Sequence, residues 1–199
     1  MIQVRTYRSA EVAAFLRVRE RFGAFSNMAS GYPMTIAGVP VASSEALYQA
    51  LRFPHLPDLQ REILEQPAPI LSKRHAYTRG AETRPDWDRV KVNVMRYSLR
   101  AKFGSTQGDL LDLLRGTGDR PIVEISNRDD FWGARPVGDG LVGRNVLGRL
   151  LMELRAEMSP HVDGAPFRVA PRFPRAVLLG KELLVEEMSP VSDLRMEPE

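Results

Sequence analysis

The stretch that decides the fold runs from Asp86 to Gly104 and reads DWDRVKVNVMRYSLRAKFG. Asp86 is a favourable N-cap residue, and Gly104 stands where a glycine commonly ends a helix. Apolar side chains recur between them at helical spacing, at Val90, Val94, Tyr97 and Ala101. This pattern predicts an amphipathic helix that buries one face in the core of a domain.

The sequence on either side of this helix predicts further helices and a few short strands. Residues 145–158 carry one apolar stripe, which predicts a second core helix: Leu147, Leu150, Leu151, Leu154 and Met158. Shorter helices are predicted over residues 45–53, 58–66, 69–80 and 109–114, and strands over residues 34–36 and 121–126. Ser43 or Ser44 is the expected N-cap of the first of these helices, and Asp58 that of the next. We expect an α+β fold, a single mainly helical domain with a few short strands.

The amino-acid composition changes after Met158. Residues 159–175 contain four prolines among basic residues, and residues 182–199 are acidic. We expect a catalytic domain over residues 1–158 and a C-terminal extension over residues 159–199. Its first part should be partly ordered, and the last dozen residues should be disordered.

Composition excludes several classes of function. The chain has 199 residues and no cysteine, which rules out disulfides, thiolate catalysis and cysteine-based metal sites. Three histidines at no ligand-like spacing make a zinc site unexpected, and we expect neither metal nor cofactor. Neither a signal peptide nor a membrane-length apolar run is visible, so we expect a cytoplasmic protein that does not bind membranes.

The positive charge of the chain is mostly arginine, with a group near its start. The net charge of +3 is too small to argue nucleic-acid binding by itself. Arginine binds phosphate in a bidentate manner, so the group could hold a phosphorylated ligand. An ordinary solvated surface explains it equally well. The group comprises Arg5, Arg8, Arg17, Arg19 and Arg21.

Residues 127–143 form a predicted long loop, and long loops in compact domains are often functional. Asp129, Asp130, Phe131 and Trp132 lie together in it. A tryptophan beside carboxylates offers a stacking surface next to an acid or base. The simpler interpretation is a buried tryptophan with solvated aspartates.

Other residues permit a catalytic and a structural interpretation. Glu45 falls in a first helical turn, where a carboxylate also gains from the helix dipole. Trp87 follows an N-cap, where an aromatic side chain is most often a core anchor. Lys73 and Lys102 are two of four lysines in a chain rich in arginine, so their ionisable amines could be required.

The order of several short motifs resembles the NADAR (YbiA-like) family of N-glycosidases along residues 15–158. Each piece is short, but nine in the right order with plausible spacing are specific. They are Phe25-Ser26-Asn27-Met28, the stretch 44–50 (SEALYQA), Ser72-Lys73, Trp87 with Met95, Lys102-Phe103, the stretch 117–119 (TGD), Glu124, Asp130-Phe131-Trp132-Gly133, and the stretch from Gly143 through Asn145 to Gly148 that leads into 150–155 (LLMELR).

The resemblance implies cleavage of N-glycosidic bonds, and the family has two relevant branches. One hydrolyses phosphoribosyl N-glycosides that arise as early riboflavin intermediates. The other removes ADP-ribose from guanine bases in nucleic acid and acts as an antitoxin against the enzyme that attached it. Arg52 stands where the riboflavin branch usually has lysine, and residues 44–57 (SEALYQALRFPHLP) look closer to the antitoxin branch. We therefore rank ADP-ribosylated guanine, in DNA or as a nucleotide, first as substrate, with a cognate ADP-ribosyltransferase toxin as the expected partner.

The resemblance also implies roles for individual residues. Glu45 and Asp130 would be the acid/base pair, and a lysine would condense with the ring-opened ribose as a Schiff base. Such a lysine must be neutral to react, which a nearby cation favours. Lys73 beside Arg74 is the first candidate and Lys102 the second. The residues expected to bind substrate are Ser26, Asn27, Tyr48, Trp87, Trp132, Gly133 and Asn145.

Three other functions remain open from the sequence. A riboflavin-intermediate N-glycosidase differs from the first choice only in its substrate. A non-catalytic ADP-ribose or NAD-binding module would bind its ligand without consuming any N-glycoside. A plain nucleic-acid-binding module ranks third, and steep salt dependence of binding would identify it.

Overall fold

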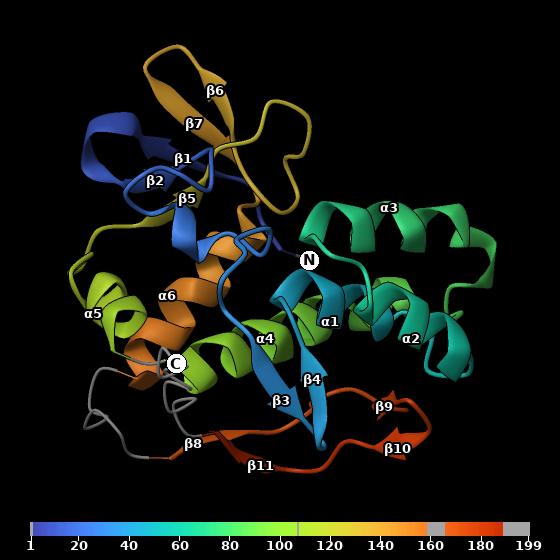
Figure 1. Ribbon diagram of the computed structural model, residues 1–199. Coiled ribbons are helices and arrows are strands. Elements are labelled where there is room, and N and C mark those ends of the chain that lie inside the picture. Colours follow the sequence, from blue (N-terminus) through green and yellow to red (C-terminus); the bar gives the residue numbers. More distant parts are fainter. Residues whose placement is uncertain (1, 107, 159–165, 189–199) are drawn as a thin grey trace, which may run out of the picture.

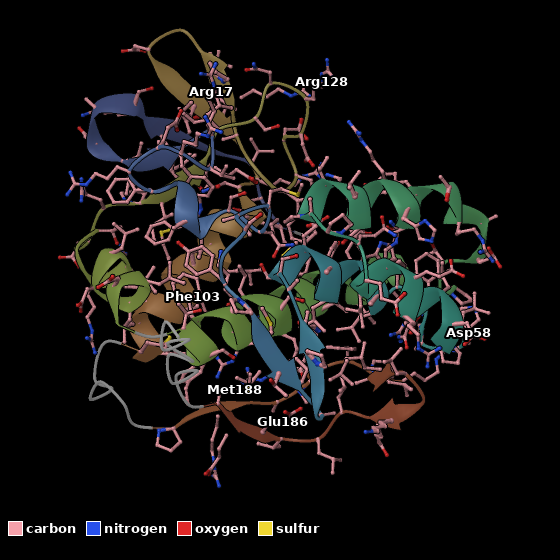
Figure 2. The ribbon with its side chains drawn as sticks, in the orientation of Figure 1. Arg17, Asp58, Phe103, Arg128, Glu186 and Met188 are labelled. Carbon is pink, nitrogen blue, oxygen red and sulfur yellow. The ribbon has the colours of Figure 1, made fainter. Side chains whose placement is uncertain are left out.

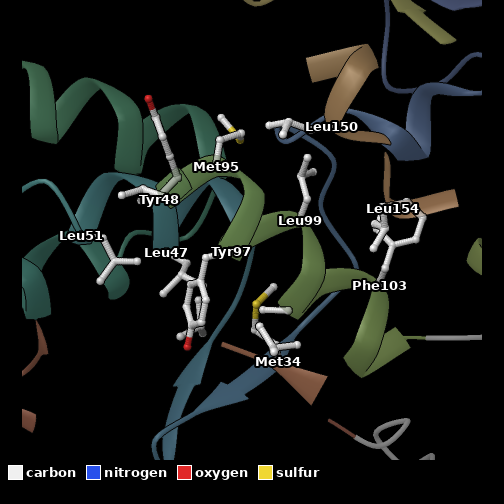
Figure 3. Packing of buried hydrophobic residues seen from close by; sticks show 14 of the residues in the cluster. Met34, Leu47, Tyr48, Leu51, Met95, Tyr97, Leu99, Phe103, Leu150 and Leu154 are labelled. Atoms are coloured by element: carbon white, nitrogen blue, oxygen red, sulfur yellow. The ribbon is translucent and has the colours of Figure 1, made fainter. Parts of the chain in front are cut away.

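The helix predicted from residues 86–104 is the centre of the fold. In the computed structural model, which describes residues 2–106, 108–158 and 166–188, it is α4 (Trp87–Thr106). Figure 3 shows Leu47 and Leu51 packed on one side of α4, and Leu150 and Leu154 on the other. These leucines come from two other segments of the chain, so α4 lies between two parts of the core and packs against both.

The fold is α+β, as predicted, with helices at the centre and short strands at the periphery (Figure 1). The other α-helices are α1 (Ser44–Ala50), α2 (Pro57–Leu64), α3 (Pro69–Thr78), α5 (Asp109–Arg115) and α6 (Val146–Met158). The strands are β1 (Arg5–Arg8), β2 (Ala13–Phe15), β3 (Met34–Ile36), β4 (Val39–Val41), β5 (Ile122–Glu124), β6 (Arg135–Val137), β7 (Gly140–Gly143), β8 (Phe167–Val169), β9 (Val177–Leu178), β10 (Lys181–Glu182) and β11 (Glu186–Met188). Short 3-10 turns lie at Ser9–Glu11, Gly23–Phe25 and Gly80–Glu82.

The strands form small separate sheets. Strands β1, β7 and β6 make an antiparallel sheet, and β3 with β4 makes a hairpin. Strand β2 pairs with β5 in parallel, placing Phe15 opposite Glu124 at the end of β5. The parallel pair therefore presents Glu124 where the chain leaves the strand.

Several helix boundaries differ from the sequence prediction: α1, for example, ends at Ala50 and was predicted to reach residue 53. Helix α4 continues past Gly104 to Thr106, and a Cβ on Gly104 would lie 2.9 Å from the Cβ of Met188. Glycine is there because another segment packs closely against it, not because the helix ends. Helix α2 begins at Pro57, so Asp58 lies in its first turn and not at its N-cap. Proline favours the first helical position because it has no N–H to leave unpaired.

The predicted loop over residues 127–143 is wrong in its second half, which forms strands β6 and β7. All three residues of β6 are exposed, so the strand carries no alternation of apolar and polar residues. No sequence pattern therefore predicted the pairing of β6 with β7.

The segment 166–188 beyond the expected catalytic domain packs into the same hydrophobic core. Phe167, Val169, Leu178 and Met188 are buried there, against side chains from the first 158 residues. Figure 2 shows Glu186 and Met188 along the lower edge of the molecule, beneath β3 and β4. The Glu186 carboxylate accepts from the backbone N–H of Ala37 at 3.1 Å. The disorder expected for the last dozen residues falls almost wholly on 189–199, outside the described residues.

No helix in the described part of the chain has an apolar run long enough to cross a membrane.

Candidate active site

A cavity of about 610 Å³ opens between α1, α3, the start of α4 and the segment that follows β5. Its size is ordinary for a small-ligand site. The lining combines carboxyl groups, aromatic rings and cations, all from segments far apart in the sequence. We call it the central cavity.

Glu45 is the carboxyl group most firmly held in the central cavity. Ser43 is the N-cap of helix α1, because its side chain accepts from the N–H of Ala46. Every residue of this helix is buried, and Glu45 is 4% exposed. Its two oxygens accept from the side-chain amides of Asn27 at 2.6 Å and Gln49 at 2.7 Å.

The orientation of the Gln49 amide is fixed from its other side. Its oxygen accepts from the guanidinium of Arg52 at 3.1 Å, so its nitrogen must face Glu45. Arg52 also donates to the Thr83 hydroxyl at 3.0 Å. Burial raises the pKa of Glu45, while the Gln49 hydrogen bond, the charge of Lys73 and the Asn27 hydrogen bond oppose this rise.

Aromatic rings form one wall of the central cavity. The ring of Tyr48 lies 5.1 Å from Trp87 and 5.9 Å from Trp132, measured between centroids. The Arg52 guanidinium stacks between Trp87, at 5.3 Å, and Tyr77, at 5.1 Å. Burial raises the pKa of Tyr48 well above its ordinary value, so its hydroxyl stays neutral. Such a wall suits a flat base or a sugar.

Two further carboxyl groups and several cations line the same cavity. Glu124 and Asp129 lie on the segment that leaves β5, and Lys73 projects from α3. Burial, followed by the charge of Asp129, raises the pKa of Glu124 to about 7, and Lys73 acts in the opposite direction. The other cations of the lining are Arg52, Lys91 and Arg128. The described residues contain no group of three or more histidine, aspartate or glutamate side chains placed to hold a metal.

Residues 14–159 match the family described as the NADAR domain. The chain belongs to the NADAR family. The N-glycosidase YbiA of Escherichia coli is 35% identical over 146 residues, which cover 73% of this chain and 87% of that protein. A riboflavin biosynthesis protein of Vibrio vulnificus is 37% identical over 144 residues, or 71% of this chain and 37% of that longer protein. The NMR structure of E. coli YbiA superposes with a TM-score of 0.64 at 31% identity, covering 77% of this chain and 91% of that one.

The structure brings together most of the site residues expected from the NADAR motifs. Glu45, Lys73 and Asn27 line the central cavity, as do the aromatic side chains Tyr48, Trp87 and Trp132. Motifs separated by up to about a hundred residues therefore meet at one cavity.

Asp130 is the main correction to the expected NADAR site. It is exposed and does not line the cavity, whereas the preceding residue, Asp129, does. One oxygen of Asp129 accepts from the backbone N–H groups of Phe131 and Trp132, both at 2.9 Å. This capped turn places Asp129 on the inside, orients Trp132 and leaves Asp130 facing solvent.

Lys102 is also not part of the cavity lining. Its side chain is fully buried, and its amine donates to the carbonyl oxygens of Ala24 at 2.5 Å and Ser26 at 3.0 Å. The amine also lies 4.5 Å from the centroid of Tyr32. Burial lowers the pKa of Lys102 to about 7. Lys102 thus fastens the loop that carries Asn27, and its amine is directed to that loop and not to the cavity lining.

Three other expected substrate contacts are part of the framework. The Ser26 hydroxyl accepts from the N–H of Met28 at 3.2 Å, within its own turn. Gly133 is buried where a Cβ would lie 2.6 Å from the carbonyl oxygen of Glu124. The Asn145 side chain accepts from the N–H of Glu124 at 3.2 Å and donates to the carbonyl of Ile122 at 2.8 Å. None of the three lines the cavity.

The sequence did not single out Glu124 or Gln49 as candidates for chemistry, and it named Asp129 only as one of two adjacent aspartates beside Trp132. Glu124 and Gln49 lay inside the matching motifs, but no local pattern distinguished them from ordinary strand and helix residues. Gln49 is near Glu45 because it follows it by one helical turn in α1, whereas the presence of Glu124 in the same cavity depends on tertiary packing, which a one-dimensional pattern does not contain.

Proposed function

We propose that this protein is a cytoplasmic N-glycosidase that hydrolyses the bond between ribose and a base, with ADP-ribosylated guanine in nucleic acid as its first-ranked substrate. The observation that carries this proposal is Glu45, a buried carboxylate held by two amide donors beside an aromatic wall. Several relatives are named N-glycosidases, including YbiA of E. coli and a protein of Nostoc punctiforme.

The chemistry of the bond requires such a carboxylate. When a base leaves ribose, positive charge develops at the anomeric carbon, and a fixed negative charge stabilises it. The amides of Asn27 and Gln49 orient both Glu45 oxygens before substrate arrives, so little reorganisation is needed. Low local polarity strengthens the attraction relative to water.

The cations of the lining support a phosphorylated substrate. Lys73, Lys91 and Arg128 surround the carboxyl groups, and arginine in particular binds phosphate oxygens in pairs. Under this proposal Lys73, the expected Schiff-base nucleophile, is near enough to Glu45 and Glu124 to affect the pKa of both. A lysine amine in this position has access to an opened ribose.

Arg52 favours the ADP-ribosyl substrate over the phosphoribosyl one. It stands where the riboflavin branch usually has lysine, and it stacks between Tyr77 and Trp87 while donating to Gln49 and Thr83. A lysine can neither stack as a plane nor donate in two fixed directions. The cavity wall is therefore built around arginine. An ADP-ribosyltransferase that makes the modification would then be the partner enzyme.

Hydrolysis of phosphoribosyl riboflavin intermediates is the second candidate. Its support is that relatives from Vibrio vulnificus and Zea mays are named riboflavin biosynthesis proteins. Both substrates share a ribose, a phosphate and a planar leaving group, so the cavity suits either class.

The test offers the protein an oligonucleotide ADP-ribosylated on one guanine and follows the release of free ADP-ribose. We expect catalytic release that restores unmodified guanine. Glu45→Gln should lose about 10²–10⁴-fold in kcat. Asp130→Asn, the matched carboxyl-to-amide change outside the cavity, should stay within a few-fold of wild type.

Each alternative outcome points elsewhere. No release from the oligonucleotide, with turnover of phosphoribosyl aminopyrimidines, would select the second candidate. Binding of ADP-ribose without turnover of either substrate would indicate a binding module. Full activity of Glu45→Gln would remove Glu45 from the chemistry.

A further inference from the structure

Glu124 is the carboxyl group of the central cavity whose role the NADAR motifs do not assign. Its backbone is fixed on both sides: its N–H donates to the Asn145 side chain at 3.2 Å, and its carbonyl accepts from the N–H of Ala134 at 2.8 Å. The β2–β5 pairing holds the strand behind it. The side chain therefore leaves a rigid backbone at the end of a strand and enters the cavity lining.

Glu124 and Glu45 share a cavity but have opposite hydrogen-bonding environments. Burial raises the pKa of Glu45 too, but Glu45 accepts from two amides, and these hydrogen bonds oppose that rise by stabilising its ionised form. Among the described residues, none donates a hydrogen bond to the Glu124 carboxyl, which favours its protonated form. Two carboxyl groups whose surroundings separate their protonation states are the usual arrangement for acid and base roles.

The charges around Glu124 shift its pKa in both directions, and the negative ones act with its burial. Asp129 and Glu45 are negative neighbours that raise its pKa, and Lys73 is the positive neighbour that lowers it. Lys91 and Arg128 also line the cavity. The resulting pKa of about 7 leaves a substantial fraction of Glu124 protonated at neutral pH.

We propose that Glu124 is the proton donor to the departing base, and that it stands in place of Asp130 in the acid/base pair that the family resemblance implied. This inference rests on the proposed N-glycosidase function. Glu124 lines the same cavity as Glu45, whereas Asp130 is exposed and does not line it.

In the hydrolysis, Glu124 both gives up the proton that the base needs and regains one. As the bond between the anomeric carbon and the base nitrogen breaks, its electron pair goes to the nitrogen, which takes the proton of the Glu124 carboxyl. Glu45 stabilises the positive charge left on the sugar. The Lys73 amine then bonds to the anomeric carbon and gives up one proton, which restores the Glu124 carboxyl. Water hydrolyses the resulting Schiff base, its oxygen going to the anomeric carbon and the lysine leaving as the free amine, which restores the starting state.

The experiment compares Glu124→Gln with wild type and with Asp130→Asn, using whichever substrate wild type hydrolyses. Glutamine keeps the shape of glutamate but has no acidic proton. We expect kcat to fall about 10²–10⁴-fold while KM stays within a few-fold. Wild type should lose kcat as pH rises above about 7 because the donor becomes deprotonated, and Glu124→Gln should lack this decline.

The outcomes separate this inference from the function on which it rests. A Glu124→Gln protein that keeps wild-type kcat and its alkaline decline overturns the proton-donor role and leaves the N-glycosidase function standing. Inactive wild type on both substrate classes overturns the function and this inference with it. If Glu124→Gln does not fold by circular dichroism, Glu124→Asp is decisive: it retains an acid on a shorter side chain, so kcat should fall while the alkaline decline persists, and loss of that decline would refute the role.

Discussion

Arg84 joins the C-terminal segment to the body of the fold, and its removal should cost much stability. Its side chain has no exposed surface. It donates to the Asp86 carboxylate at 2.6 and 3.0 Å and to the carbonyl oxygens of Pro174 at 2.6 Å and Arg175 at 3.4 Å. Its backbone N–H donates to the carbonyl of Arg52, a residue of the cavity wall. The Arg84 side chain thus links the start of α4 to the C-terminal segment, and its backbone links both to the neighbourhood of the site.

The cost of Arg84→Met follows from these contacts. Breaking a buried ion pair by removing one partner costs about 3–5 kcal/mol. Asp86 retains 23% exposure, so water can partly replace Arg84, and the lower end of that range applies. For a chain of this length, about 1 kcal/mol lowers Tm by about 2–4 °C. We therefore expect a loss of about 3 kcal/mol and a fall in Tm of about 6–12 °C.

Thermal and urea unfolding followed by circular dichroism measure both quantities. Arg61→Met is the matched control, because Arg61 pairs with Asp58 at the surface, with side chains 53% and 90% exposed. An exposed pair contributes about 0–1 kcal/mol. If Arg84→Met destabilises no more than Arg61→Met, the C-terminal segment is not held by Arg84 and the reasoning is refuted.

Three further predictions concern the lysines and Arg52. Because the folded pKa of Lys102 is about 7 and the ordinary value is 10.5, the unfolded chain holds the extra proton between these values. In urea unfolding, the free energy of unfolding of wild type should therefore fall from pH 10 toward pH 7 more steeply than that of Lys102→Met, by up to about 1.4 kcal/mol per pH unit. Equal slopes for the two proteins would contradict this prediction. Borohydride added during turnover should trap a covalent adduct on Lys73, seen by mass spectrometry, and an adduct that survives in Lys73→Ala excludes that lysine as nucleophile. Arg52→Lys should lower kcat/KM for the ADP-ribosylated substrate about tenfold, since a lysine loses the stacked plane and one hydrogen bond; an unchanged value would show that Arg52 does not shape specificity.

The sequence predicted the helices well because their signals are local. Apolar periodicity identified α4 and α6, and Ser43 and Pro69 marked helix starts within one residue of the observed bounds. The prediction missed strand β6 because its three residues are all exposed and therefore show no alternation of buried and exposed side chains. The role of Gly104 was also hidden, since it depends on Met188, which lies 84 residues away in the sequence.

The same distinction applies to the site: local motifs predicted some of its residues, and tertiary packing decides the others. The order of motifs predicted Glu45, Trp87 and Trp132, and all three line the cavity. It could not decide between Asp129 and Asp130, because adjacent residues in a loop point in different directions. That choice is made by the turn in which Asp129 accepts two backbone N–H bonds.

Asn145 shows how a motif residue can serve a site without contacting the ligand. Its backbone is left-handed, with φ of 47°, which asparagine tolerates better than most residues. This places its side chain against β5, where it bonds to Ile122 and Glu124. Gly148, one turn into α6, must lack a side chain, because a Cβ would lie 2.0 Å from the carbonyl oxygen of Ile122. The start of α6 therefore packs closely against β5. The same contacts that position the helix also hold the backbone of Glu124 at the cavity. A stretch that resembles a ligand-binding motif in sequence is, in three dimensions, the support of a carboxyl group about twenty residues away.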